Sequence, residues 1–154
     1  MSMDLTTILS SGVVAGTIAG LVTLRTAERN IAIENITKQR AIWREKIREK
    51  SLEVTKAFLA KDEIKLLALY NEFLLLLNPF DSEDKLIMDV LWELKSSEPE
   101  NRKLIEFSER LSLLLKHDWE RAKREAKPIF FRGAKPKRKV YGNFKNKRKI
   151  IAKK

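Results

Sequence analysis

The stretch LTTILSSGVVAGTIAGLVTL, residues Leu5 to Leu24, decides how the chain is organised, because it carries no charge over its whole length. A helix of about 20 residues covers the roughly 30 Å hydrocarbon core of a bilayer. Hydroxyl groups in such a helix can bond to the carbonyl one turn earlier, so they cost little in lipid. The stretch predicts a transmembrane anchor over residues 1–24. A cleaved signal peptide and a buried helix of a soluble protein are the alternatives.

Three glycines recur at every fourth position of this stretch, at Gly12, Gly16 and Gly20. This spacing places all three on one face of a helix, where a second backbone can approach closely. We expect a helix-packing surface in the membrane, most simply between copies of the chain in a homo-oligomer. The alternative is that glycine is simply common in membrane spans.

The charges on either side of the stretch predict its orientation. Asp4 is the only charged side chain before it, whereas Arg25, Arg29, Lys38 and Arg40 follow it closely. Positively charged residues near a span remain on the cytoplasmic side. We therefore expect a single-pass protein of the cell inner membrane with its N-terminus outside and the bulk of the chain in the cytoplasm.

The composition argues against enzyme classes that need particular residues. The chain has no cysteine, which excludes disulfides and thiolate zinc sites, and no glycine lies between Gly20 and Gly133, which excludes the glycine-rich phosphate-binding loops. The only histidine, His117, has no second metal ligand at a suitable spacing. We expect no enzymatic activity, no catalytic or metal-binding residues and no cofactor.

Apolar periodicity and the prolines predict an all-α fold, with a small cytoplasmic helical bundle over residues 25–126. Asp62 and Glu63 suit the positive start of the second helix, Asp81 or Ser82 can cap the third, and Pro79 and Pro99 mark helix boundaries. The anchor helix is expected to continue to about residue 60, and the later helices to cover about 62–77, 82–96 and 100–126.

An arginine row follows the predicted anchor, formed by Arg40, Arg44 and Arg48 beside Trp43. These side chains can contact a partner or lipid headgroups, because guanidinium groups clamp anions and stack on indole rings. The alternative is structural: Trp43 enters the core and the arginine stems cover its edge. The sequence favours the structural alternative.

The tail over residues 127–154 holds twelve Lys or Arg and no acid, which leaves 20 basic and 21 acidic residues in positions 1–126. We expect a flexible tail that binds polyanions, with the anionic leaflet as the nearest ligand of an anchored chain. Binding of RNA or DNA through phosphate contacts and base stacking is the alternative, and a solubilising tail without a partner is a third. The expected contact residues are Lys135, Lys137, Arg138, Lys139, Tyr141, Phe144, Lys145, Lys147, Arg148 and Lys149.

Two segments of the chain resemble a loose group of uncharacterised small bacterial and phage membrane-anchored proteins. In that group an "IT..R..WR..IR" segment follows the anchor and a "WERxK" segment closes the last helix. The matching positions here are Ile36, Thr37, Arg40, Trp43, Arg44, Ile47 and Arg48, then Trp119, Glu120, Arg121 and Lys123. The resemblance implies an anchored helical protein and no catalytic residues, and it does not extend to the basic tail.

These features together predict an interaction protein that tethers or recruits a partner at the cytoplasmic membrane face. A narrower hypothesis, based on the small anchored helical architecture alone, makes it a membrane effector of a bacterial antiphage system. The alternative function is nucleic-acid binding at the membrane through the tail.

Overall fold

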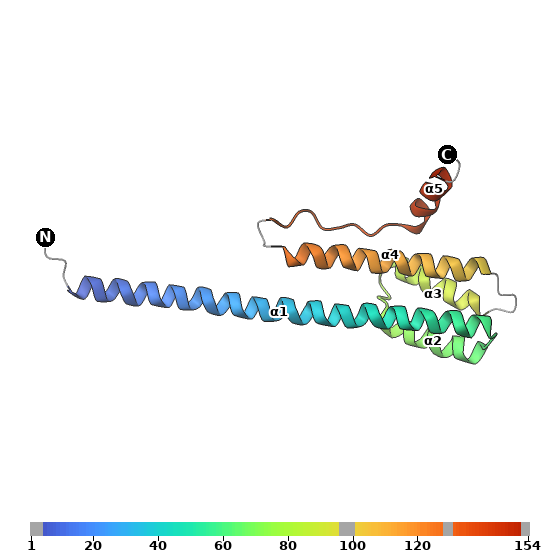
Figure 1. Cartoon of the computed structure of the whole chain (residues 1–154), viewed down its shortest axis with the longest axis horizontal. Coiled ribbons are helices and arrows are strands. Elements are labelled where there is room, and N and C mark those ends of the chain that lie inside the picture. The colour runs from blue at the N-terminus through green and yellow to red at the C-terminus, as the bar shows by residue number, and fades with distance from the viewer. Residues whose placement is uncertain (1–4, 96–100, 128–130, 152–154) are drawn as a thin grey trace. The chain divides into compact units, whose positions relative to one another are not determined.

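The computed structural model describes residues 5–95, 101–127 and 131–151, and the side chains of these residues apart from 5–11, 32 and 148–151. The regular secondary structure of the described residues is α-helical, as Figure 1 shows, and these residues contain no strand. The helices are α1 (Leu5–Leu59), α2 (Glu63–Leu76), α3 (Ser82–Leu94), α4 (Asn101–Ala126) and α5 (Tyr141–Ile151). The predicted all-α helical bundle is confirmed.

The chain divides into two compact units, Met1–Gln39 and Arg40–Lys154. The second unit contains the last part of α1 and all the later helices. Its boundary differs from the predicted one at residue 25, because the residues of α1 that enter the core begin near Trp43. The tail belongs to the same unit as the bundle.

One apolar cluster holds the four helices of the bundle together. Ile47, Leu69, Phe73, Ile87 and Phe107 are fully buried and come from all four helices. The rings of Phe73 and Phe107 meet edge to face, with their centroids 5.5 Å apart. Burial of such side chains stabilises the fold by about 1.5–3 kcal/mol each.

Short turns that the structure describes separate α1 from α2 and α2 from α3. At the end of α1, Lys61 adopts φ 54°, the left-handed conformation that usually belongs to glycine, and the Asp62 N–H donates to the Ala57 carbonyl at 2.9 Å. The Asp62 carboxylate then accepts from the Lys65 N–H at 2.8 Å and caps α2. Asp81 caps α3 in the same way, through the N–H groups of Glu83 and Asp84.

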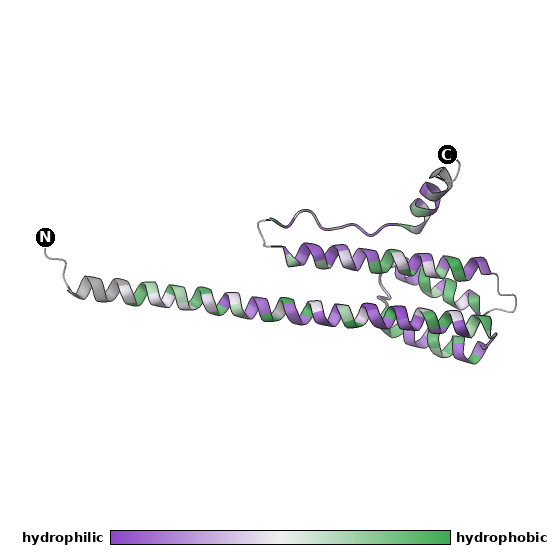
Figure 2. Cartoon of the chain, in the orientation of Figure 1, coloured by the Kyte–Doolittle hydropathy of each residue, from purple (hydrophilic) through white to green (hydrophobic). Residues whose placement is uncertain are grey.

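Among the residues that the structure describes, no helix is long and apolar enough to cross a membrane. The first part of the predicted anchor, the side chains of residues 5–11, lies outside the described residues, as do residues 1–4. From Gly12 to Leu24 the helix carries apolar and weakly polar side chains, and charged residues follow from Arg25 onward (Figure 2).

Candidate functional site

The arginine row of α1 mainly pairs with carboxylates of α4. Arg44 is buried, and its Nη1 lies 2.8 Å from Oδ2 of Asp118, which is also buried. Arg40 donates from both terminal nitrogens to the Glu125 carboxylate, and its Nε lies 3.8 Å from Oδ1 of Asp118. These two arginines therefore fasten α1 to α4.

The tryptophans beside the row are also engaged within the bundle. Trp43 packs against the core, and its indole N–H donates to the Leu76 carbonyl at 2.9 Å, at the end of α2. The Arg44 guanidinium lies over the Trp119 ring, 5.6 Å from its centroid. The two segments that carry the resemblance thus contact each other.

Arg48 differs from the other members of the row. Its side chain is 54% exposed and pairs with Glu45 on the same helix, at 3.1 Å. The geometry of Arg40, Trp43 and Arg44 fits the structural alternative, and Arg48 is the member of the row that solvent or a partner can reach.

The glycine face of α1 is open in the described chain. A Cβ atom added at Gly12, Gly16 or Gly20 would meet no other atom within 4 Å. Large apolar side chains occupy the rest of the helix surface, and Val13, Ile18, Leu21, Val22 and Leu24 are each more than half exposed.

The described part of the tail lies against the bundle, so the prediction of a flexible tail is wrong for these residues. The Arg124 side chain of α4 donates to the Gly133 carbonyl at 2.7 Å, and Arg132 donates to the Glu125 and Lys127 carbonyls. We call residues 131–140 the strap. It lies along α4 in extended form and leads into α5, which was not predicted (Figure 1).

Arg138 fastens the strap to the start of α3. Its Nη1 donates to Oδ1 of Asp81 and its Nη2 lies near Oδ1 of Asp84, both at 2.6 Å. Asp84 is buried and also accepts from the Asn78 N–H at 2.8 Å. Burial alone would raise the pKa of Asp81, but the Arg138 charge and the N–H groups of α3 hold it below its ordinary value of 3.8.

Tyr141 holds the start of α5. Its hydroxyl donates to Glu109 at 2.8 Å, and its ring lies 4.2 Å from the Arg110 guanidinium. Burial, followed by the hydrogen bond to Glu109, raises the pKa of Tyr141 to about 12. The ring is therefore not free for the base stacking or interfacial insertion that the sequence suggested.

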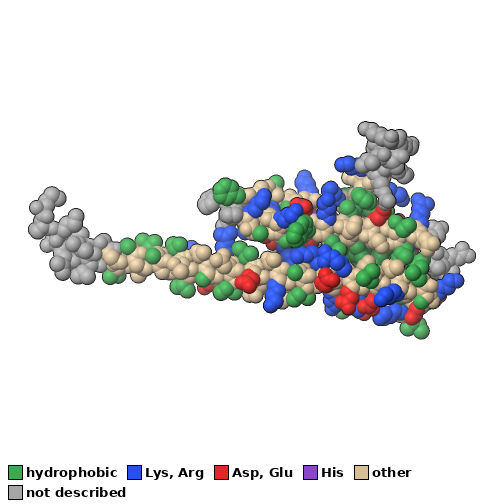
Figure 3. Space-filling view, in the orientation of Figure 1, with side chains coloured by type: hydrophobic (Ala, Val, Ile, Leu, Met, Phe, Trp, Pro, Cys, Tyr) green, Lys and Arg blue, Asp and Glu red, His purple; other side chains and the backbone are tan. Residues whose placement is uncertain are grey.

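The lysines of the strap remain exposed. Lys135, Lys137 and Lys139 are exposed, whereas Pro136 and Arg138 between them are half-buried against the bundle. This alternation is that of an extended chain with one face covered. Figure 3 shows Lys and Arg side chains gathered over α4 and the strap.

Some of the remaining predicted contact residues of the tail are exposed to solvent, and others are half-buried. Lys147 is exposed, and Lys145 and Phe144 are half-buried beside Tyr141, with the Phe144 and Tyr141 ring centroids 6.2 Å apart. The side chains of Arg148 and Lys149 lie outside the described residues.

His117 lies beneath the strap, where it lines a small cavity of about 40 Å³ with Lys116, Pro136, Lys137 and other residues. Burial, followed by the positive charges of Arg121 and Arg138, lowers the pKa of His117 below its ordinary value of 6.5. Among the side chains that the structure describes, no cluster of His, Asp and Glu could hold a metal ion.

Sequence reasoning missed the acidic partners of the tail, which are Asp81, Glu83, Asp84 and Glu109. The sequence shows several acids at the start of α3, but helix capping is enough to explain them there. The sequence therefore gives no sign that they bind the tail. Comparison with protein-family models, with curated proteins and with solved structures found no match for this chain.

Proposed function

We propose that the protein is a single-pass, membrane-anchored interaction protein whose helical bundle and basic strap act at the cytoplasmic face of the inner membrane. The observation that carries this proposal is the exposure of α1 from Gly12 to Leu24, an uncharged segment that none of the described residues covers, while the bundle buries a core of its own. A helix that is apolar all round needs an apolar environment.

The hydroxyl groups of this segment support the proposal. Thr17 donates to the Val13 and Val14 carbonyls, at 3.0 and 2.9 Å, and Thr23 donates to the Ala19 carbonyl at 2.8 Å. These polar groups are satisfied within the helix, as a lipid environment requires. Gly12–Leu24 is about 20 Å long at 1.5 Å per residue, so the proposed span also needs the preceding residues from Leu5. The open glycine face would serve for packing between copies.

Fractionation of cells that express the full chain tests the anchor, with the membrane pellet washed in high salt and then in alkaline carbonate. We expect the protein to resist both washes. Replacing Ile18 and Leu21 together with Lys should release it into carbonate, because each central Lys costs about 2.5–3.5 kcal/mol in a span. The matched control replaces Leu52 and Leu59, exposed apolar residues of α1 in the bundle, with Lys and should behave as the unaltered chain. Release of the unaltered chain by salt alone would overturn the anchor.

The strap supplies the proposed contact with anionic lipid. Each Lys near an anionic surface contributes about 1 kcal/mol, and Lys135, Lys137 and Lys139 are already ordered on the outer side of the strap. Because Tyr141 is buried, its ring serves neither base stacking nor interfacial insertion, and the proposed contact rests on the exposed lysines. For a chain that is anchored in the membrane, the anionic leaflet is the nearest polyanion, which favours lipid over nucleic acid.

Limited cleavage of the full chain in vesicles by proteinase K, which does not require Lys or Arg, tests this contact. We expect slower cleavage within the strap when anionic lipid is added to neutral vesicles. The effect should weaken when Lys135, Lys137 and Lys139 are replaced together with Gln, and should persist when Lys46, Lys56 and Lys61 of the bundle are replaced instead. Protection by RNA or DNA, without protection by anionic lipid, would support the nucleic-acid alternative.

A further inference from the structure

Helix α2 has two apolar faces, of which the bundle uses one. Leu66, Leu69 and Phe73 point into the core and are buried. The opposite face carries no charged side chain, and we call it the outer stripe. Its members are Ile64 (84% exposed), Leu67, Ala68, Asn71, Leu74 and Leu75 (88% exposed). An uncharged stripe about 120° wide on a solvent-facing helix is typical of an interaction surface.

The order of residues along the outer stripe matches a dimeric coiled coil. Ile64 and Asn71 are seven residues apart, as are Leu67 and Leu74. In heptad terms, Ile64 and Asn71 occupy a positions and the two leucines occupy d positions. A β-branched residue at a with Leu at d favours two parallel strands, and a single Asn at a fixes register and oligomeric state.

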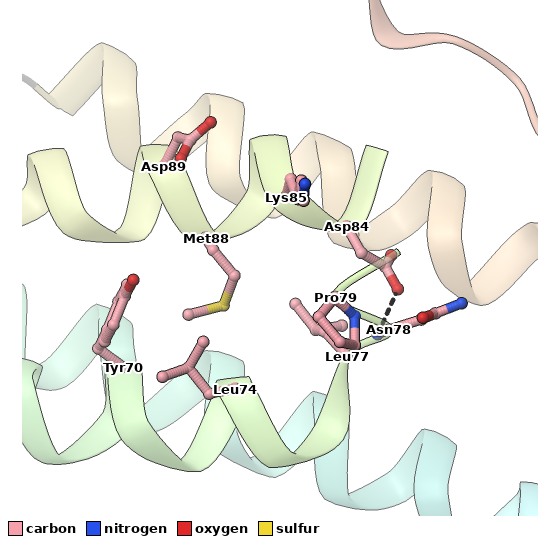
Figure 4. Close-up of a pocket in the computed structure, with 9 residues that line it drawn as sticks. All are labelled: Tyr70, Leu74, Leu77, Asn78, Pro79, Asp84, Lys85, Met88 and Asp89. Carbon is pink, nitrogen blue, oxygen red and sulfur yellow. Dashed lines mark hydrogen bonds between the residues drawn. The ribbon is translucent and has the colours of Figure 1, made fainter. Parts of the chain in front are cut away.

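The outer stripe has a protruding side chain on one edge and a hollow on the other. The hollow is a groove of about 310 Å³ between α2 and α3, lined by Tyr70, Leu74, Leu77, Asn78, Pro79, Asp84, Lys85, Met88 and Asp89. Figure 4 shows the Tyr70, Leu74 and Met88 side chains converging on it. On the opposite edge, at the same height along the helix, Leu75 projects into solvent. A twofold axis parallel to α2 would bring the Leu75 of each copy to the groove of the other.

We propose that the outer stripe of α2 binds the same stripe of a second copy of this chain, in parallel. Asn71 then faces Asn71 across the twofold axis, the Ile and Leu residues pack at the a and d positions, and Leu75 of each copy fills the groove of the other. Two heptads suffice because α2 is already held as a helix by the bundle, so dimerisation does not have to order it.

The flanks of the outer stripe favour a second copy over a lipid surface. Helices that lie on anionic membranes carry Lys and Arg beside their apolar face. Here the flanking residues are Glu63, Lys65 and Glu72. Lys65 is paired with Glu53 at 3.0 Å and Glu72 with Lys50 at 2.9 Å, so the flanks carry no excess of positive charge. Neutralised flanks allow two identical surfaces to approach without repulsion.

The absence of cysteine from the chain permits a clean cross-linking test. Single substitutions Asn71→Cys and Ile64→Cys are placed in the full chain, which is then oxidised mildly in unfractionated lysate. We expect both variants to form a disulfide-linked band of twice the chain mass. The matched control is Ser112→Cys, an exposed position of α4, which should give several-fold less. The cross-links should persist in a Gly16→Leu background, because the outer stripe is separate from the glycine face.

Three outcomes would overturn the proposal. Cross-linking at position 71 without cross-linking at 64 would indicate antiparallel pairing, which places the two Ile64 residues about 20 Å apart. Bands of other masses would indicate a different partner, and yields equal to that of Ser112→Cys would indicate no contact. A second variant, Leu75→Asp combined with Asn71→Cys, should lose the cross-link while keeping its helical circular dichroism, because Leu75 contributes nothing to the core. Leu52→Asp with Asn71→Cys should keep the cross-link.

Discussion

Asp118 and Arg44 form a charged pair that is removed from water between α1 and α4, at 2.8 Å. The pair explains why an arginine row can lie beside the core. Replacing such a pair with apolar residues can be neutral, whereas removing one partner leaves the other charge buried without compensation. Arg44, one of the residues predicted to contact a partner, therefore stabilises the packing of α1 against α4.

We predict that Asp118→Ala lowers the free energy of unfolding by about 3 kcal/mol, because it leaves the Arg44 guanidinium uncompensated. Chemical denaturation followed by circular dichroism measures the change. Glu45→Ala is the matched control, since it breaks the exposed pair with Arg48 and should change stability by less than about 0.5 kcal/mol. Equal effects of the two substitutions would contradict the assignment.

At the scale of single elements, the start of α3 serves two purposes. The Asp81 carboxylate caps the helix and also pairs with Arg138 of the strap, while Asp62 caps α2 without an ion pair to the tail. The two aspartates thus separate the effect of capping from the effect of holding the tail.

We predict that Asp81→Ala and Asp62→Ala each lose about 1 kcal/mol of cap energy, and that Asp81→Ala alone also makes the strap more sensitive to trypsin. The pKa of Asp81 is lowered in the folded chain. Its stabilising contribution is therefore present above its ordinary pKa of 3.8 and is lost as the pH falls through the lower, folded value. Trypsin is inactive in acid, so cleavage by pepsin across this range should show release of the strap at low pH. An equally sensitive strap in Asp62→Ala would contradict the prediction.

The apolar periodicity of the sequence and the residues typical of helix ends predicted the first four helices closely, because each helix depends on local sequence. The predicted end of α1 near residue 60 and the predicted start of α2 at Asp62 agree with the structure, and of the two predicted caps of α3, Asp81 and Ser82, the structure has Asp81. The docking of the tail could not be predicted in this way. Arg138 meets Asp81 across 57 residues, and a basic run with glycine and proline has no local signal for its partner.

At the scale of the whole molecule, the unit Arg40–Lys154 contains the buried cluster and the ion pairs that join α1 to α4. None of the residues in that cluster comes from Met1–Gln39. The bundle therefore has the means to fold without the proposed anchor.

We predict that a chain starting at Arg40 unfolds cooperatively, with a Tm within a few degrees of that of the full chain. The Arg138→Gln variant of the shorter chain should melt at a lower temperature, because it leaves Asp84 without its ion pair. Thermal circular dichroism measures both. A shorter chain that lacks a cooperative transition would show that the first unit contributes to the stability of the second.

The position of the tail's binding residues has a consequence for the order of folding. Asp81, Glu83 and Asp84 belong to α3 and its cap, whereas Glu109 and Arg110 belong to α4, so the surface that receives Arg138 and Tyr141 exists only after these helices have packed. The tail also follows these helices in the sequence, so it leaves the ribosome after them. Its docking is thus a late step, and losing Arg138 should speed unfolding while leaving the rate of folding nearly unchanged.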